Sequence, residues 1–424
     1  MKQVIVMAMQ GEFSHIVIVG GGFAGLTAAQ NLKKQKNIKI TIIDVNNYHV
    51  FQPFLYQVAC GDLAPSDIAV PIREQFKNYK NISVIMDEAT VIDSDKKIVF
   101  TKNATALNYD YLILAVGSED NYFGNNHWRE HTIGLKSLKN ALKIRKELLE
   151  TFERAEIANH KKHVTFTIIG GGPTGVELAG AIAELTKQAI RSDFTHINPL
   201  DTEIILIEAG SRILSSLAPS LSAVAQKSLE EKGIVIKLNS KVMDISPHQI
   251  KLWSGEKIES DLIIWAAGVK AKSIKHLLNK DEIKLGTNQR VLVKNDLSLP
   301  FNSNIFIVGD AAEIKGKDNK AVPALAAAAT QQGKFIAKVI RARVAGSEKE
   351  YEFKYLNFGN MAIIGRYSAV ADFTWIKFKG VLAWIIWDLA HIYFLIGFRN
   401  RLTVFVKWLW SYITHGKAER IIIK

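Results

Sequence analysis

The chain has 424 residues, more than a domain with a single hydrophobic core usually contains, so its length predicts two or three domains. A single cysteine, Cys60, excludes a disulfide framework and any multi-cysteine metal site, and the 11 histidines are too scattered to predict a metal site. The net charge of +13 indicates an anionic partner, but the basic residues do not alternate with aromatic ones along one arm, so we do not expect a nucleic acid.

The first residues, 1–13, are mildly apolar but are interrupted by Gln3, Gln10 and Glu12. No long apolar stretch with a small-residue cleavage site precedes the first expected strand. We therefore expect no secretory signal.

The first expected strand, 15–19, is apolar throughout and runs into a glycine-rich loop and a helix over 26–34. The loop has the pattern GxGxxG, whose glycines permit a tight turn, the approach of a pyrophosphate, and close packing of helix on strand. The amides and the positive end of the helix dipole would then face the phosphates. The residues predicted to bind this dinucleotide are Gly20, Gly22, Phe23, Ala24 and Gly25.

A second apolar strand, 38–43, ends at Asp44, whose carboxylate can accept hydrogen bonds from a ribose diol. The glycines alone would be weak support for a nucleotide site. The order strand, glycines, helix, strand and acid is much more specific, and it disfavours the alternative of a glycine-rich turn without a ligand.

The same order recurs with strands over 165–169 and 203–207 and a helix over 176–184. The spacing from the second glycine loop to its acid exceeds the usual value of about 20 residues, which we attribute to an extended helix and loop over 186–201. An acid at this place favours NADH over NADPH by repelling a 2′-phosphate, unless a nearby arginine such as Arg212 offsets it. The residues predicted to bind this second dinucleotide are Gly170, Gly172, Thr174, Gly175 and Glu208.

One nucleotide would occupy only one dinucleotide site. The two sites therefore predict two nucleotides, one a bound cofactor and the other an exchanging co-substrate. Two strands with matching ends, YLILAVG and LIIWAAG, follow the two loops, as is expected where the chain passes between paired domains. They add Ala115 and Gly117 to the first site, and Ala267 and Gly268 to the second.

The strand over 304–308 ends in Gly309 and Asp310. This ending resembles the late FAD motif of glutathione-reductase-like flavoproteins, whose aspartate binds the ribitol chain; a plain turn is the alternative. By this resemblance the first site belongs to FAD and the second to a nicotinamide dinucleotide.

The predicted fold is therefore of the α/β class. It has two Rossmann-like dinucleotide-binding domains, arranged as in glutathione-reductase-like proteins, and a C-terminal amphipathic helical region that anchors the chain to a membrane. The predicted boundaries are 1–119 and 288–345 for the FAD domain, 120–287 for the NAD(H) domain, and 346–424 for the C-terminal region.

Longer motifs extend over nearly the whole chain. The segments YHVFQPFLYQVAC at 48–60 and DIAVPIR at 67–73 resemble a stretch of the type II NADH dehydrogenases, the single-subunit NADH:quinone oxidoreductases. The similarity continues in GGGPTGVELAG, IEAGSRIL, WAAGV and HIYFLIGFRNRL. It implies hydride transfer from NADH to FAD and then reduction of a membrane quinone without proton pumping. Cys60 alone cannot replace the paired redox cysteines of disulfide reductases.

The resemblance also implies catalytic residues. Glu177 matches a family glutamate near the flavin and nicotinamide, which adds it to the residues predicted to bind the second dinucleotide and implies a role in proton handling or ring positioning. The alternative is an acid favoured by the helix dipole. Lys379 matches a family lysine beside the flavin and quinone, although a basic side chain at a membrane edge is an equally simple explanation.

The family pattern AQxAxQ is only partly kept, because Ala327 replaces its first glutamine. The other glutamine, Gln331, is retained and is the third predicted catalytic residue. An Ala-rich helix packed against FAD is the alternative. The predicted quinone contacts are Ala328, Gln331 and Gln332.

The segment 381–398 is strongly apolar and barely long enough to span a membrane, but it contains Asp388 and His391. An aspartate at mid-bilayer would cost about 2.5–3.5 kcal/mol, which disfavours a transmembrane helix. Basic residues outnumber acidic ones around it, and a cluster of tryptophans is typical of a membrane interface. These tryptophans are Trp375, Trp384, Trp387, Trp408 and Trp410.

This region therefore predicts an anchor lying in the interface of an anionic membrane, on the cytoplasmic face of the inner (cell) membrane. A dimerisation surface using the same face is compatible with it, and we expect a homodimer. Two rival functions share the fold: a soluble NAD(P)H flavoprotein that reduces a protein electron carrier, and a redox-responsive binding protein with negligible turnover. The apolar C-terminal region disfavours both.

Overall fold

The computed structural model describes residues 13–158, 163–189, 193–316, 320–373, 375–414 and 419–422, so most of the stretch considered for a signal lies outside it. The chain forms two compact units. Unit 1 comprises residues 1–50, 70–119 and 269–357. Unit 2 comprises residues 51–69, 120–268 and 358–424.

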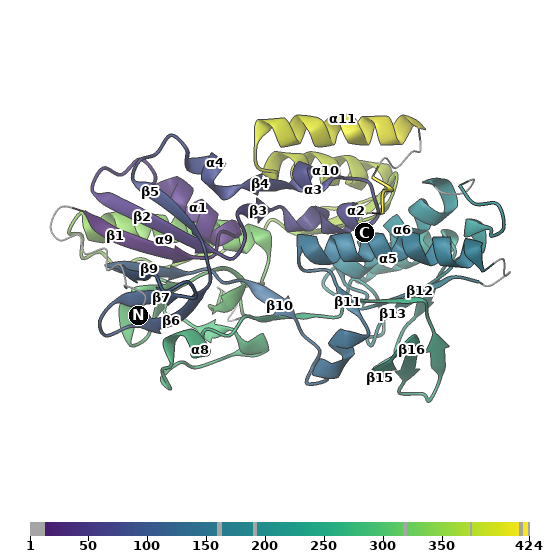
Figure 1. Cartoon of the computed structure of the whole chain (residues 1–424), viewed down its shortest axis with the longest axis horizontal. Coiled ribbons are helices and arrows are strands. Elements are labelled where there is room, and N and C mark those ends of the chain that lie inside the picture. Colours follow the sequence, from purple (N-terminus) through teal and green to yellow (C-terminus); the bar gives the residue numbers. More distant parts are fainter. Residues whose placement is uncertain are drawn as a thin grey trace. The chain divides into compact units, whose positions relative to one another are not determined.

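Unit 1 is built on a six-stranded sheet in the order β21-β22-β9-β1-β2-β5, in which only β21 is antiparallel to its neighbour (Figure 1). Its central strands β1 and β2 are mostly apolar and buried, as is typical of a parallel sheet covered on both faces. Helices α1 (Phe23–Leu32) and α9 (Ala326–Val344) pack against each other. The strands are β1 (Ser14–Val19), β2 (Ile38–Asp44), β5 (Ile82–Met86), β9 (Tyr111–Leu114), β21 (Ser298–Leu299) and β22 (Asn302–Ile307).

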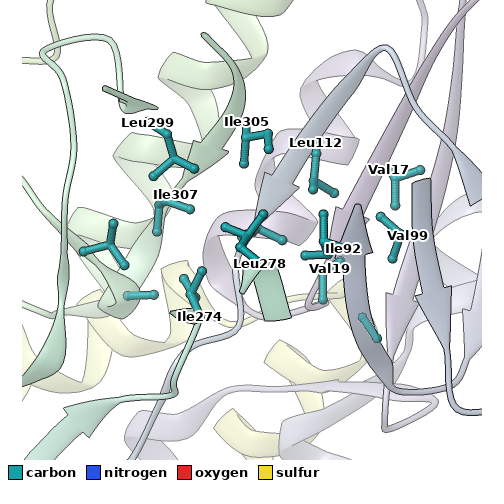
Figure 2. Close-up of a cluster of buried hydrophobic side chains, with 14 of the residues drawn as sticks. Val17, Val19, Ile92, Val99, Leu112, Ile274, Leu278, Leu299, Ile305 and Ile307 are labelled. Carbon is teal, nitrogen blue, oxygen red and sulfur yellow. The ribbon is translucent and has the colours of Figure 1, made fainter. Parts of the chain in front are cut away.

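Behind this sheet lies a hydrophobic core that draws on distant parts of the chain (Figure 2). Leu112, Ile305 and Ile307 of the sheet are fully buried there. They share this core with a small antiparallel sheet and with Leu278 of helix α8 (Lys275–Leu278). The small sheet consists of β6 (Ala89–Asp93), β7 (Ile98–Thr101) and β8 (Ala106–Asn108).

Unit 2 contains a second, entirely parallel sheet in the order β11-β18-β12-β13-β14. An antiparallel sheet of three strands is inserted in the chain between β14 and β18. The parallel strands are β11 (Ile133–Gly134), β12 (Thr165–Ile169), β13 (Glu203–Ile207), β14 (Ile234–Lys237) and β18 (Leu262–Trp265). The other elements are α5 (Leu138–Ile157), α6 (Pro173–Glu184), α7 (Pro219–Glu231), β15 (Val242–Ser246), β16 (Gln249–Leu252) and β17 (Lys257–Glu259).

Two further segments of the chain belong to unit 2. Residues 51–69 form η1 (Gln52–Phe54), α2 (Leu55–Ala59) and α3 (Pro65–Ile68). Helix α2 packs on α5 and α6. The C-terminal part forms β24 (Asn360–Gly365), β25 (Ser368–Asp372), β26 (Lys377–Lys379), α10 (Gly380–Phe394) and α11 (Phe398–Thr414) (Figure 1).

The remaining short elements connect these parts. They are β3 (Tyr48–Val50), β4 (Ala69–Pro71), α4 (Ile72–Phe76), β10 (Ser118–Asp120), η2 (Asn126–Glu130), β19 (Val269–Ala271), η5 (Thr287–Gln289), β20 (Val291–Leu292) and β23 (Ala312–Glu313). Strands β10 and β19 pair with each other.

This division into two units differs from the predicted boundaries in four places, one of which is residues 346–357, predicted to belong to the C-terminal region but grouped with unit 1. Residues 269–287 join unit 1, because Ile274 and Leu278 pack into its core. Residues 51–69 join unit 2 through α2, and the C-terminal part joins it because β24 packs on α6. The sequence did not reveal these assignments because they depend on contacts between distant segments.

The tryptophans of the C-terminal part differ from the prediction in their exposure. Trp384, Trp387 and Trp408 are buried, so they belong to the core of unit 2 and do not seek a membrane interface. Of the five tryptophans named in the prediction, Trp375 and Trp410 are exposed. Among the described residues, no helix is long and apolar enough to cross a bilayer.

The contact of α6 with β24 gives a test of the fold. A Cβ added at Gly180 would overlap the carbonyl oxygen of Ile364. Gly180→Ala should therefore lower the free energy of unfolding by about 1–3 kcal/mol, measured by denaturant titration. Gly172→Ala is the matched control, because a Cβ there meets no protein atom within 4 Å. Equal stability of the two variants would contradict this packing.

Candidate functional site: two dinucleotide loops and a buried carboxylate

The backbone of the first glycine loop, in unit 1, leaves free space in front of helix α1. Gly20 has a φ of +108°, and a Cβ there would overlap the carbonyl oxygen of Ala115, so only glycine fits. At Gly22, by contrast, a Cβ would meet no protein atom within 4 Å. The second glycine thus leaves free space in front of the amides that begin α1, which is where a pyrophosphate needs to approach.

Asp44 ends β2 beside this loop. Its carboxylate accepts hydrogen bonds from the Gly21 amide at 2.6 Å and from the Asn46 amide at 2.7 Å. His49 supports the loop from inside, since its Nδ1 lies 2.9 Å from the Gly21 carbonyl oxygen. Burial lowers the pKa of His49, which keeps the ring neutral. The sequence analysis had assigned no role to this histidine, whose neighbours in the motif are mostly apolar.

The other residues assigned to FAD follow neighbouring strands of the same sheet. Ala115 and Gly117 come after β9, which lies between β1 and β22. Gly309 and Asp310 come directly after β22, and the Ser118 hydroxyl donates to the Asp310 carboxylate at 2.5 Å. Because the carboxyl ends of parallel strands meet at one edge, the topology brings these residues to the edge that carries the glycine loop.

The second glycine loop repeats this geometry within unit 2. Gly170 has a φ of +115°, and a Cβ there would overlap the backbone of Ala266. Gly172 has the same open space in front of it as Gly22. Ala267 and Gly268 follow β18, next to β12 in the sheet, and Thr174 is exposed in the first turn of α6.

Glu208 takes the position in this loop that Asp44 has in the first. Its carboxylate accepts from the Gly171 amide and from the Gly210 amide, both at 2.7 Å. The longer spacing from the loop is taken up by a π-helical turn over Leu185–Ala189 and by the loop that leads to η4 (Pro199–Asp201).

Arg212 does not offset this acid. Its guanidinium group donates to the carbonyl oxygens of Leu217 and Ser215, both at 2.8 Å. These hydrogen bonds hold the guanidinium group of Arg212 within its own loop.

The third feature is a small cavity of about 60 Å³ inside unit 2. It is lined by residues from α2, α6, β24, α10 and α11. Glu177, in the second turn of α6, is one of them, and burial raises the pKa of its carboxyl group to about 8. The backbone of Ile363 and the indole of Trp387 partly offset this shift. At neutral pH this carboxyl group therefore holds a proton that it can release, as a general acid requires.

The residues predicted to contact quinone on α9 are engaged with the protein itself. Gln332 is buried, and its Oε1 accepts from the Gly309 amide at 2.6 Å. Gln331 exchanges two hydrogen bonds of 2.9 Å with the backbone of Leu356, and Ala328 is buried. Quinone contact by these residues stays a prediction. The structure gives Gln332 another role, since it holds the turn that carries Asp310.

Lys379 is exposed at the end of β26, directly before α10. The charged residues of α10 are partly buried in unit 2. The Tyr412 hydroxyl donates to Asp388 at 3.1 Å, and burial raises the pKa of that carboxyl group to about 7. His391 stacks on Trp387 with ring centroids 3.9 Å apart, and burial lowers its pKa to about 4. This burial explains how an apolar segment tolerates an acid and a histidine.

Comparisons with known proteins agree with this geometry. Residues 14–333 match the family model of the pyridine nucleotide-disulphide oxidoreductases, and residues 358–415 match the NDH2 C-terminal domain. The chain is 36% identical over 422 residues to the type II NADH:quinone oxidoreductase Ndh of Mycobacterium tuberculosis, covering 96% of this chain and 90% of that protein. It is 28% identical to a protein of the same name from Haemophilus influenzae, covering 85% and 87%.

Among solved structures, the fold resembles that of NDH2 from Plasmodium falciparum in complex with NADH. The TM-score is 0.87, with 22% identity, 97% of this chain and 100% of that chain covered. The sulfide:quinone oxidoreductase of Aquifex aeolicus has a similar fold, with a TM-score of 0.73, 20% identity, and 96% and 92% covered.

The raised pKa of Glu177 predicts a pH effect on stability. Between the ordinary pKa of about 4.3 and the folded value of about 8, the unfolded chain loses the proton that the folded chain keeps, so stability falls as pH rises. Glu177→Gln removes this pH-dependent fall in stability, because the amide does not titrate. The melting temperature of Glu177→Gln minus that of the unmodified chain should increase from pH 5 to pH 8 and stay constant above pH 8. Glu153→Gln, at an exposed position on α5, is the control and should follow the unmodified chain.

Proposed function

The chain belongs to the pyridine nucleotide-disulphide oxidoreductase family and, within it, to the type II NADH:quinone oxidoreductases, and we propose that it oxidises NADH and reduces a membrane quinone. The observation that carries this proposal is the pair of glycine loops, each with free space before a helix N-terminus and each with an acid at the next strand. FAD, when bound, supplies the redox chemistry by taking a hydride from NADH and passing two electrons to quinone.

The chain's own residues would hold the two dinucleotides. In unit 1 the amides of the first loop would bind the pyrophosphate of FAD, Asp44 a ribose, and Asp310 the ribitol chain. In unit 2 the second loop and Glu208 would hold NADH in the same way. Both acids now accept hydrogen bonds from backbone amides, which fixes their carboxylates at the strand ends where a ribose diol can reach them.

Reduction of quinone requires two protons as well as two electrons. We assign one of them to Glu177, because burial keeps its carboxyl group protonated at neutral pH. Lys379 and Gln331 remain candidates for contact with the quinone. Their assignment rests on the family resemblance.

The first experiment measures NADH oxidation by the purified, FAD-loaded chain with and without a short-chain ubiquinone or menaquinone analogue. Rapid turnover that depends on quinone supports the proposal. Flavin that NADH reduces but that no quinone reoxidises would instead favour a protein electron carrier as acceptor.

The discrimination between NADH and NADPH tests Glu208. Glu208→Ala should raise the kcat/KM of NADPH relative to NADH by about 10-fold to 100-fold, because a like-charge contact with the 2′-phosphate is removed. Glu203→Ala, at the exposed start of the same strand, is the control and should leave the ratio unchanged. An unchanged ratio in Glu208→Ala would argue against the ribose assignment.

We propose that the chain binds the cytoplasmic face of the membrane through α10 and α11. At this surface it would meet the quinone. These helices expose a set of large apolar side chains while their tryptophans Trp387 and Trp408 remain buried. The exposed side chains include Leu382, Leu389, Phe398, Phe405, Leu409, Trp410 and Ile413. Basic residues on α11, together with the net charge of +13, suit a surface of anionic lipid.

A double substitution tests this surface. Phe405→Glu with Leu409→Glu should weaken binding to vesicles that contain anionic phosphatidylglycerol by about tenfold or more, measured by co-sedimentation. Val235→Glu, at an exposed apolar position on β14, should bind like the unmodified chain. If the double variant still binds vesicles but changes from dimer to monomer in sedimentation velocity, the apolar face is the surface of a homodimer instead.

A further inference from the structure

A chain of hydrogen bonds connects α11 to the cavity that contains Glu177. The Trp408 indole donates to Gln57 Oε1 at 2.8 Å, and Gln57 Nε2 donates to the Tyr56 hydroxyl oxygen at 2.8 Å. Each of these three side chains is at least nine-tenths buried. Tyr56, Gln57 and Trp408 line the same cavity as Glu177.

The donors and acceptors fix the direction of this chain. An indole nitrogen can only donate, so Gln57 has to turn its oxygen toward Trp408 and its NH₂ group toward Tyr56. The tyrosine oxygen therefore serves as an acceptor for Gln57, and its own hydrogen is left for another partner. Among the described residues no protein atom accepts that hydrogen, whereas the charge of Glu177 acts on the tyrosine more strongly than that of any other group.

Tyr56 cannot act as a proton relay in this arrangement. Burial and Glu177 raise the pKa of its hydroxyl well above the usual value, and the Gln57 amide behind it donates a hydrogen bond but is too weak an acid to transfer a proton. A fixed donor beside a carboxyl group has a different effect. It stabilises the ionised form, as hydrogen bonds to carboxylates do in general.

We propose that Tyr56 is a positioning residue for Glu177, oriented by Gln57 and Trp408 so that its hydroxyl hydrogen points into the cavity toward the carboxyl group. The hydrogen bond, made directly or through one water molecule, favours the carboxylate that remains after Glu177 has given up its proton. The inference rests on the proposed function, in which Glu177 supplies a proton for quinone reduction. It also makes the acidity of Glu177 depend on α11, the helix proposed to contact the membrane.

Other charged and titratable groups surround the cavity, and none of them is altered in the test. The guanidinium group of Arg366 donates to the backbone carbonyls of Ser411 and Tyr412, and its amide donates to Glu184. Glu184 also pairs with Lys232 at 3.4 Å. The groups facing the cavity or packed against it are Asp62, Glu184, Arg366, Asp388, His391 and Tyr412.

The test measures kcat/KM for a water-soluble quinone against pH in the FAD-loaded enzyme. Tyr56→Phe removes the donor, so the alkaline limb of the profile should move up by about one pH unit. Trp408→Phe should produce a shift of the same sign without touching Tyr56 or Glu177. With its indole donor gone, Gln57 can turn its oxygen toward the tyrosine and accept the hydrogen.

Two matched controls separate this effect from a general loss of structure. Tyr109→Phe removes another buried hydroxyl group, in unit 1, and Trp253→Phe makes the same change as Trp408→Phe at an exposed position directly after β16. Neither should shift the profile. The pH dependence of the melting temperature gives an independent readout, since Tyr56→Phe and Trp408→Phe should extend the fall in stability to higher pH.

The outcomes are distinct. A Tyr56→Phe profile that matches the unmodified enzyme, or a shift in Tyr56→Phe with none in Trp408→Phe, overturns the proposal. Glu177→Gln tests the proposed function separately: if it keeps both the activity and the alkaline limb, Glu177 is not the proton donor, whatever the tyrosine variants do.

Discussion

The nucleotide-binding features of this protein depend on the close approach of backbone to backbone at the carboxyl edge of each parallel sheet. In both units the first glycine of the loop lies so near the neighbouring strand end, at Ala115 or at Ala266, that any side chain would collide with it. This approach turns the loop so that the next helix begins with its amides facing outward. A ligand can approach the free space at Gly22 and Gly172 only because the first glycine of each loop, Gly20 or Gly170, allows the backbone to turn there.

The same edge also determines which distant residues meet. In unit 1, β9 and β22 lie beside β1, and therefore Gly117 and Asp310 are carried to the glycine loop although they are far from it in the chain. Gln332 of α9 then holds the turn at Gly309. The helix that the family resemblance assigns to quinone thus has a structural connection to the turn assigned to FAD.

In unit 2, burial of polar groups links the C-terminal helices to Glu177. Trp387 partly offsets the effect of burial on that carboxyl group, and Trp408 anchors the hydrogen-bond chain through Gln57. Lys407 of α11 pairs with the buried carboxylate of Asp67 at 2.7 Å, which fastens the helix to α3. One side of the helical pair therefore belongs to the core of unit 2, and its opposite side exposes apolar side chains.

The sequence by itself determined the two dinucleotide loops, the strands that flank them and the acids Asp44 and Glu208, because these features follow from local patterns of glycine and apolar residues. It also indicated an apolar C-terminal region with exposed side chains. Only the tertiary structure decided the membership of residues 51–69 and 269–287, the burial of Trp384, Trp387 and Trp408, and the contact of His49 with the first glycine loop. Burial and hydrogen-bond partners come from segments that lie far apart in the chain, so no local pattern records which side of a helix faces the core or which donor meets a carboxyl group.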